Sequence, residues 1–498
     1  MKKPYFLLSI STLSRLILLI FKYLKKPSIK YSPYSDSIEY YTLGDGKTLK
    51  IGILSDSQLQ PSESEKKYEP FTNHLKKALT FLLKEKVEVI IFAGDIGEKG
   101  TKYAFDLFNK TYKSIFNSSS YEPILNIIMG NHDYLNDEIE SIEIKQQRFE
   151  NSIFQKPFSH KVINNFHFIN WGSEDSSDDH CNMNITWAKN QIEYSIKNST
   201  NEKNPIFITT HVNPKNTVYG SDDWGNKMIF DLFNNYNQII SFSGHSHYPL
   251  IDERSIFQDN FTAIQTQAVA YLDCEYGFEN GKMIKDQFDD WNLSLRNPMG
   301  IIANVDIGKI VFKRFSIENF SFYDKEWIVD FPIFKKDFRY LNNSRFEKSK
   351  KPFFDFEVKE FLNGGFFENN QIKKFDNDIN YFNKINKISK INNVSDVIVV
   401  DYYNNLPIIE FKQAIHDNFV HHYKLDFYNE KGFYQSYYYI SDFFLMPNDR
   451  KEYIRFKITR KLDPGNYTLR IYAVESFGKM SDNYVQGKVT QFEEPFQN

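Results

Sequence analysis

The feature that most constrains this chain is a short apolar segment that ends in a polar motif, repeated five times. Each segment is apolar almost throughout, which is typical of a strand buried on both faces of a sheet. The predicted strands are Leu49–Leu54, Val87–Ala93, Ile124–Met129, Ile206–Thr210 and Ile239–Phe242. Apolar residues recur at helical spacing in Phe71–Lys86 and Lys102–Phe116, between the first three strands. This β-α-β-α-β order predicts an α/β fold with parallel strands.

Polar motifs follow these strands directly: SDSQ, GDIGEKG, GNHD, a lone histidine and SGHSH. Sites in open α/β sheets form at the carboxyl ends of the strands, so we expect the five motifs to converge on one edge. The residues they would bring together are Asp56, Gln58, Asp95, Asn131, His132, Asp133, His211, His245 and His247. Taken singly, Asp56 is more often a helix cap and GDIG is a common turn, whereas GNHD and GHSH are moderately specific, so the argument depends on the five in order.

The donors in this set are carboxylates, amides and imidazoles, without a thiolate. That mixture suits two divalent ions such as Mn, Fe, Zn or Ni, and the sequence does not say which. Asp95, central in the series, can bridge two ions about 3.5–4 Å apart, the spacing that two-metal hydrolysis uses. Gly94 and Gly130 suit a backbone that turns sharply and approaches closely after a strand. We therefore expect a dinuclear metal centre.

Over about Lys50–Ile317 the chain resembles the calcineurin-like metallophosphoesterase superfamily, whose motif series is D-x-H, GD, GNH[DE], H and GHxH. The resemblance implies two packed mixed sheets with helices outside, a four-layer α/β/β/α sandwich. It implies that one metal is held by Asp56, Gln58, Asp95 and His247. It implies that the other is held by Asp95, Asn131, His211 and His245. His132 would protonate the leaving oxygen, and Asp133 would orient His132.

The activity implied is metal-dependent hydrolysis of a phosphoester, in which a hydroxide bridging the ions attacks phosphorus and His132 is the general acid. Protein phosphatases of the superfamily carry GDxxDRG and GNHE, whereas this chain has Lys99 in GDIGEKG and has GNHD. Lysine lacks the bidentate fork of arginine, so phosphodiesters or small phosphomonoesters are the expected substrates. Substrate-binding residues stay unknown; Trp224, Asp222 and Asp223 are rim candidates.

Gln58 departs from the pattern, since most members have histidine there. An amide oxygen is a harder and usually weaker ligand than imidazole, so the first metal is expected to bind less tightly or to favour harder ions. This D-x-Q form resembles some other members of the superfamily. The alternative is a catalytically weak or inactive protein that keeps the fold as a binding scaffold.

The N-terminus, residues 1–44, is predicted to be a signal or anchor followed by a leader. Lys2 and Lys3 precede an apolar stretch that contains Arg15, and Lys22 follows it. Membrane association through residues 5–24, with a secreted or membrane-anchored extracytoplasmic location, is the expectation. A helix on the cytoplasmic membrane surface and a soluble helix are the alternatives, because Arg15 is costly at mid-bilayer.

The 498 residues leave room for further domains. We predict the phosphoesterase-like domain at 45–330, a connector at 331–393 and a C-terminal all-β sandwich of the immunoglobulin or fibronectin III type at 394–490. Leu462–Gly478 resembles the late strands of fibronectin type III modules. The net charge of −3 indicates no nucleic-acid-binding surface. Two cysteines, Cys181 and Cys274, exclude a disulfide framework. Oligomeric state is unknown.

Overall fold

The computed structural model describes residues 31–340 and 398–492, apart from short gaps. The gaps are residues 36, 118, 120, 137–138, 178–183, 200–203, 222–223, 274–277, 280–281, 284–294, 335–336, 404–405, 416–418, 459–461 and 477–479. The predicted anchor at residues 5–24, most of the predicted connector, both cysteines, Asp222 and Asp223 lie outside the described residues. In the described part of the chain, no helix combines the length and the hydropathy needed to cross a bilayer.

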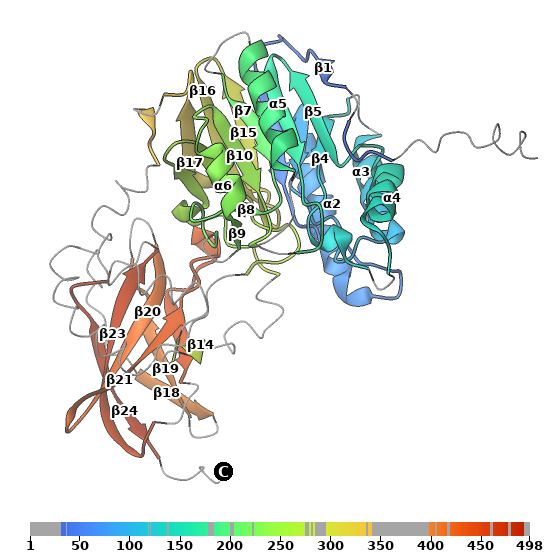
Figure 1. Ribbon diagram of the computed structural model, residues 1–498. Coiled ribbons are helices and arrows are strands. Elements are labelled where there is room, and N and C mark those ends of the chain that lie inside the picture. Colours follow the sequence, from blue (N-terminus) through green and yellow to red (C-terminus); the bar gives the residue numbers. More distant parts are fainter. Residues whose placement is uncertain are drawn as a thin grey trace, which may run out of the picture.

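Two sheets pack face to face in the first part of the chain (Figure 1). The seven-stranded sheet has the order β1-β5-β6-β7-β10-β12-β11. Its strands are β1 (Glu39–Tyr41), β5 (Phe158–Ile163), β6 (Phe166–Trp171), β7 (Ile206–Thr209), β10 (Ile239–Ser243), β12 (Thr262–Gln265) and β11 (Ile256–Gln258). The six-stranded sheet has the order β17-β16-β15-β2-β3-β4. Its strands are β17 (Ser321–Asp330), β16 (Lys309–Ser316), β15 (Met299–Asp306), β2 (Leu49–Leu54), β3 (Val89–Phe92) and β4 (Ile124–Ile127).

Side-chain alternation explains why these strands are apolar on both faces. In β3, Val89 and Ile91 join the core between the two sheets, whereas Ile90 and Phe92 join the core beneath the helices. The strands β2, β3 and β4 pair in parallel, as do β6, β7, β10 and β12. The predicted parallel arrangement of the five motif-bearing strands is therefore confirmed.

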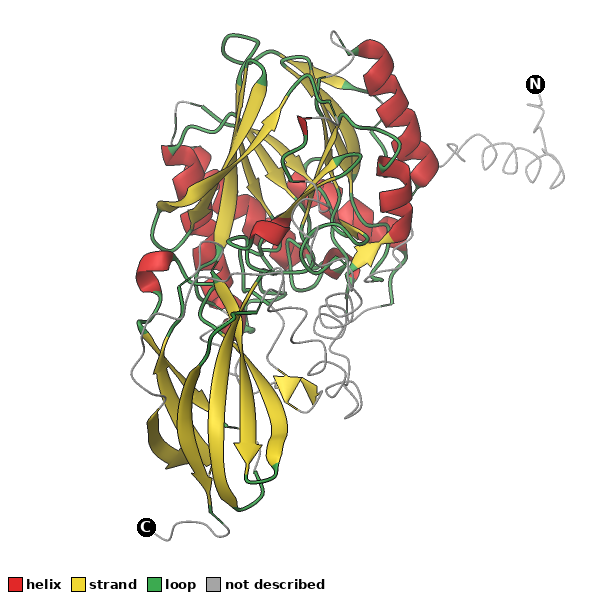
Figure 2. Cartoon of the chain, turned by 90° about the vertical axis from the view of Figure 1, so that its left-hand side faces the viewer, coloured by secondary structure: helices red, strands yellow, loops and turns green. Residues whose placement is uncertain are grey.

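Helices cover the outer face of each sheet (Figure 2). Apolar residues of α2 (Glu69–Lys84) and α3 (Lys102–Phe116) pack on the six-stranded sheet, with α4 (Ile142–Ile153) beside α3. Those of α5 (Ile185–Asn198) and α6 (Lys227–Phe233) pack on the seven-stranded sheet. The α3 helix begins where predicted, because the Thr101 side chain accepts a hydrogen bond from the Ala104 N–H. The expected four-layer α/β/β/α order is observed.

The apolar run Phe261–Ala270 predicts a further strand, and this prediction is wrong in its second half. The strand β12 ends at Gln265, and the chain then crosses to the neighbouring sheet. There the N–H groups of Val269 and Ala270 donate to the carbonyls of Ser55 and Asp56, at 3.0 Å each. The apolar composition of this segment reflects burial beneath a loop, so it does not distinguish loop from strand.

The C-terminal part is all β, as predicted. One sheet has the order β14-β13-β21-β20-β23-β24 and the other β18-β19-β22. The strands are β13 (Phe278–Glu279), β14 (Lys282–Met283), β18 (Ile398–Tyr403), β19 (Leu406–Lys412), β20 (Val420–Asn429), β21 (Gly432–Ile440), β22 (Tyr453–Lys457), β23 (Gly465–Glu475) and β24 (Val485–Gln491). The Tyr467 hydroxyl donates to the Asp463 carbonyl, like the tyrosine corner of immunoglobulin-like sandwiches. Membership of the fibronectin III type stays a prediction.

The two parts share one apolar core. Ile440, Phe443 and Phe444, which end β21 and begin the next loop, belong to the cluster that also holds Leu250 and Ile251 of the first part. The Asn297 amide donates to the Phe444 carbonyl at 2.9 Å. In addition, β13 pairs with β21 although it lies in the stretch assigned to the first domain. The junction is therefore a packed interface, which composition alone did not reveal.

Candidate metal centre

The five polar motifs meet at one edge of the two sheets, beyond the carboxyl ends of β2, β3, β4, β7 and β10. Asp56, Asp95 and His211 each offer a ligand atom, and these atoms lie within 4.8 Å of one another. All three side chains are buried. Buried carboxylates beside an imidazole are costly unless paired or bound to a cation, which makes this cluster the centre of the candidate site.

His211 shows most directly that a cation fits here. Its Nδ1 lies 2.8 Å from the Ala93 carbonyl and so carries a proton that it donates. Its Nε2 lies 2.9 Å from Asn131 Oδ1 and 3.3 Å from Asp95 Oδ2, which are both acceptors. Burial opposes a charge on His211, but Asp95 outweighs it and raises the pKa of His211 to about 9. A proton or a metal ion is therefore required between Nε2 and the two oxygens.

Three further candidate ligands have buried polar atoms without a hydrogen-bond partner in the described part of the chain. They are Gln58 Oε1, His245 Nε2 and His247 Nδ1. The other nitrogen of His247, Nε2, lies 3.2 Å from Asp56 Oδ1. Buried polar atoms usually have partners, so three unpartnered atoms in one cluster fit residues that would hold metal ions.

The backbone of the candidate site is strained in the same places. Asp56, Gln58, Asp95, His245 and His247 all have φ between 42° and 72°. Left-handed φ is uncommon outside glycine and costs about 1–3 kcal/mol per residue. Both histidines of the GHSH motif have left-handed φ. On a flat strand, side chains at i and i+2 would not be re-aimed, whereas this backbone conformation allows both imidazoles to face the same centre. Strain of this kind concentrates at functional sites.

Three glycines leave the space that the carboxylates need. A Cβ on Gly130 would lie 2.1 Å from Asp95 Oδ1, and a Cβ on Gly244 would lie 2.2 Å from Asp56 Oδ2. Gly94 has φ +89°, and a Cβ there would meet His211 Nδ1 at 2.7 Å. The expected need for close approach at Gly94 and Gly130 is thus met, and Gly244 adds a third case.

Asp133 makes different contacts from those expected. Its carboxylate accepts backbone N–H bonds of 2.9–3.2 Å from Gly130, Gly97 and Ile96. Burial and the nearby Asp95 raise the pKa of Asp133 to about 7. The His132 imidazole instead has Nδ1 3.0 Å from the Glu98 carbonyl. The Asp133 carboxylate therefore joins the loop after β3 to the loop after β4. The Glu98 carbonyl, and not Asp133, orients His132.

The Asp95 carboxylate has partners from three other candidate site residues. Besides His211, it accepts from the His132 N–H at 2.9 Å and from Gln58 Nε2 at 3.0 Å. Burial raises its pKa, but the coulombic effect of His211 and His132 outweighs this and lowers the pKa of Asp95 overall. Asp95 therefore stays a carboxylate, as a bridging ligand would need.

Aromatic rings enclose the centre. The Trp224 ring lies 5.7 Å from the His245 ring, in an edge-to-face arrangement, and the Tyr271 ring lies 4.5 Å from the His247 ring. Trp224 was a rim candidate in the sequence, whereas Tyr271 was missed. The sequence signal for Tyr271 is its position directly after the apolar segment Phe261–Ala270. Glu98 was missed as well, because a backbone carbonyl leaves no trace in composition.

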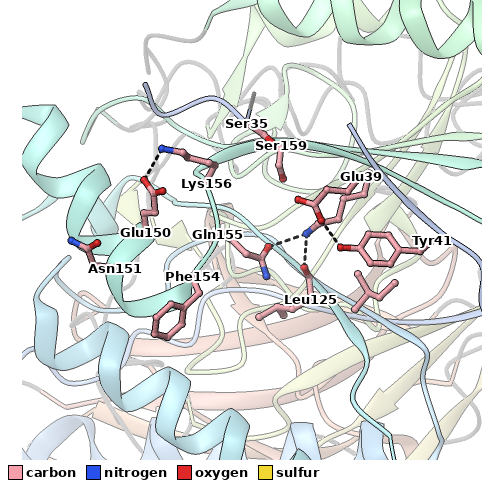
Figure 3. Close-up of a pocket in the computed structure, with 12 residues that line it drawn as sticks. Ser35, Glu39, Tyr41, Leu125, Glu150, Asn151, Phe154, Gln155, Lys156 and Ser159 are labelled. Atoms are coloured by element: carbon pink, nitrogen blue, oxygen red, sulfur yellow. Dashed lines mark hydrogen bonds and ion pairs between the residues drawn. The ribbon is translucent and has the colours of Figure 1, made fainter. Parts of the chain in front are cut away.

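A separate pocket of about 650 Å³ lies beside β1 and β4, the edge strands of the two sheets (Figure 3). It is lined by Leu125 at the beginning of β4, by residues after α4, and by Glu39, Tyr41 and Lys161. The candidate ligands follow the opposite end of β4. This pocket is therefore not part of the candidate metal centre.

Residues 49–249 match the model of the family described as calcineurin-like phosphoesterase, which supports the resemblance for that part of the chain. A dimetal phosphatase from Danio rerio is similar in structure, with 11% identity and a TM-score of 0.37 over 57% of this chain and 99% of that one. A purple acid phosphatase from yellow lupin seeds has 11% identity and a TM-score of 0.39 over 57% of this chain and 54% of its own. No curated protein sequence matches the chain.

Proposed function

We propose that the chain is a metal-dependent phosphoester hydrolase with a dinuclear centre, acting on phosphodiesters or small phosphomonoesters. The observation that carries the proposal is the cluster of ligand atoms around Asp95. There His211 Nε2 faces two acceptor oxygens, and Gln58, His245 and His247 each have an unpartnered polar atom. The family match of residues 49–249 supports the same chemistry.

The donor set divides into two groups that share Asp95. One ion would be held by Asp56, Gln58, Asp95 and His247. The other would be held by Asp95, Asn131, His211 and His245. Two divalent ions bound there, such as Mn, Fe, Zn or Ni, would acidify a water nucleophile and neutralise charge on the phosphoryl oxygens. The chain itself supplies the buried, preorganised ligands.

His132 is the residue that would give a proton to the leaving oxygen. Its Nδ1 is held by the Glu98 carbonyl, 3.0 Å away, which leaves Nε2 for the substrate. Burial lowers the pKa of His132, but Asp95 and the Glu98 carbonyl outweigh this effect and raise the pKa overall. The imidazole is therefore oriented and can carry the proton that general acid catalysis requires.

Metal analysis of the purified full chain, with a panel of phosphomonoesters, phosphodiesters and nucleotides, tests the proposal. We expect about two divalent ions per chain and turnover of at least one ester class. Asp95→Asn should lose both ions, whereas Asp106→Asn, on the exposed side of α3, should keep them. Full metal content in Asp95→Asn would contradict the bridging role, and turnover of none of these esters would contradict the hydrolase.

His132→Ala tests the general acid. We expect kcat for an alkyl phosphoester to fall by about a hundredfold and kcat for a p-nitrophenyl ester much less, because p-nitrophenolate leaves without protonation. Steady-state kinetics with both esters measures the difference. Equal losses for the two leaving groups would remove His132 from this role.

A binding scaffold that keeps the fold without catalysis is the second candidate. The presence of Gln58 where the family pattern has histidine is the observation that favours it, because an amide oxygen is usually a weaker metal ligand than imidazole. Bound metal without turnover of either bis-p-nitrophenyl phosphate or p-nitrophenyl phosphate would support the scaffold and exclude the hydrolase.

A further inference from the structure

The loop after His211 connects the candidate metal centre to the C-terminal sandwich. We call the described residues 213–221 and 224–226 the rim loop. Its ends are tied together by the parallel pairing of β8 (Asn213–Pro214) with β9 (Gly225–Asn226). Inside it, the Trp224 N–H donates to the Gly220 carbonyl at 2.9 Å. The position of Trp224 over His245 therefore depends on the segment that contains Gly220.

That segment is packed tightly against the GHSHY stretch. The Tyr219 ring lies 4.5 Å from the Tyr248 ring. Gly220 has φ +78°, and a Cβ there would lie 2.6 Å from the Tyr248 ring and 3.2 Å from Ser246 Cβ. The Arg254 guanidinium also lies over the Tyr219 ring, 3.7 Å from its centroid, and Asp252 holds Arg254 in an ion pair. These contacts hold the Tyr219 side chain in one position.

The sandwich contacts this tyrosine through β20. Tyr219 Oη lies 3.0 Å from His421 Nε2, and both residues are buried. Burial lowers the pKa of His421 well below its ordinary value, so the imidazole is neutral and can accept from the hydroxyl. His421 Nδ1 in turn lies 3.0 Å from His422 Nδ1. A buried hydrogen bond therefore joins residues that are 202 positions apart in the chain.

The sandwich side of this bond is itself rigid. The His421 ring packs on the Phe443 ring at 4.5 Å, and Phe443 stacks on Phe419 at 4.9 Å. Phe443 and Phe419 belong to the core shared by the two parts of the chain. A hydrogen bond between two well-packed partners loses little entropy when it forms, so it can hold the rim loop in place.

We propose that the C-terminal sandwich holds the rim loop over the candidate metal centre through the His421–Tyr219 hydrogen bond, which makes His421 a positioning residue for substrate binding. The loop carries Trp224 onto His245, next to the expected position of the phosphoester. The effect on substrate binding rests on the proposed function, whereas the coupling between sandwich and loop does not. The sandwich is therefore a working part of the site in addition to a structural appendage.

Tyr219→Phe and His421→Leu in the full chain remove the hydrogen bond with little change in volume. We expect faster amide hydrogen exchange in the rim loop, measured by mass spectrometry with bound Mn²⁺, at unchanged metal content and with a melting temperature lowered by only about 2–4 °C. For the best ester of the panel, KM should rise about fivefold while kcat changes by less than about twofold, the effect of losing one buried hydrogen bond. The double variant should be no worse than either single one.

Two variants serve as controls. His421→Gln keeps a side chain that can bond to the hydroxyl, so it should restore most of the protection and of KM. Tyr434→Phe removes a hydroxyl that donates to Asp463 at 2.8 Å at an exposed place in the sandwich, so it should leave the rim loop unchanged.

Unchanged rim-loop exchange in Tyr219→Phe and His421→Leu would overturn the coupling. Faster exchange with an unchanged KM would overturn the positioning role. A wild-type chain without turnover would contradict the proposed function, and the exchange comparison would still decide the coupling.

Discussion

Gln58 is the residue that most alters what the candidate centre can bind. Its side chain divides its two polar atoms, because Nε2 donates to Asp95 Oδ2 at 3.0 Å while Oε1 is buried without a partner in the described residues. An imidazole at this position would offer one metal-ligand atom, a nitrogen that is softer than the amide oxygen. An amide that also donates a hydrogen bond to the shared carboxylate withdraws charge from it. Both effects lower the affinity of this half of the site for soft ions.

Gln58→His is therefore expected to raise the affinity for Zn²⁺ by about tenfold, since imidazole suits Zn²⁺ better than an amide oxygen does. Competition with a chromophoric chelator measures this affinity. Gln60→His is the matched control, because Gln60 lies two residues on and donates to the Tyr103 hydroxyl, outside the ligand set. The expectation fails if both variants bind Zn²⁺ like the wild type.

At the scale of elements, the hairpin of β5 and β6 contains two buried histidines in hydrogen-bond contact with each other. His160 Nε2 lies 2.9 Å from His167 Nδ1, and both rings are buried. Burial lowers the pKa of His160 to about 4. Burial, and then the neighbouring His160, lowers the pKa of His167 to about 4 as well. The hairpin therefore folds around neutral imidazoles.

This pair predicts a loss of stability in acid. Above the unfolded pKa near 6.5, both imidazoles are neutral in either state. As the pH falls from about 6.5 towards 4, the unfolded chain takes up protons that the folded hairpin does not, so the free energy of unfolding falls. Between pH 7 and pH 5 the loss is about 2 kcal/mol for each histidine.

Denaturant unfolding at pH 7 and pH 5 checks this, with His167→Gln as the comparison. Titration of the other histidines is common to both proteins, so the difference between their pH dependences isolates the pair. We expect the variant to lose less stability on acidification than the wild type. An equal loss in both proteins would show that the pair does not titrate as its burial implies.

At the scale of the whole molecule, the junction decides whether the chain behaves as two bodies or one. Most interfaces between domains of one chain are polar enough to allow relative motion. Here Phe443, Phe444 and Leu445 are buried in the same cluster as Leu250 and Ile251. The loop of the sandwich is thus part of the core of the first domain, and we expect the two parts to unfold together.

Calorimetry of the full chain should accordingly show one main transition. Phe444→Ala should lower its midpoint, because removal of a buried phenyl group costs about 3–5 kcal/mol. Phe433→Ala, at an exposed place in β21, should change it little. Two resolved transitions in the wild type, only one of which shifts in Phe444→Ala, would contradict a shared core.

Much of the fold follows from the sequence because burial on both faces leaves a direct mark. The strands β2, β7 and β10 and the helix α3 were predicted to within one residue at each end, since continuous apolar segments and apolar residues at helical spacing are local signals. The segment after β12 was not, because burial under a loop leaves the same apolar mark as burial in a sheet. The short β13 carries no signal that would assign it to the C-terminal sheet.

The sequence by itself determined which side chains reach the candidate site, because parallel strands bring their carboxyl ends to one edge whatever the loops do. Only the tertiary structure decided how those side chains divide their contacts. It directs Asp133 to three backbone N–H groups, His132 to the Glu98 carbonyl and Tyr219 to His421. These contacts join positions far apart in the chain and often involve backbone atoms, which every residue has. A linear pattern therefore predicts the candidate ligands, and three-dimensional packing supplies the partners that hold their side chains.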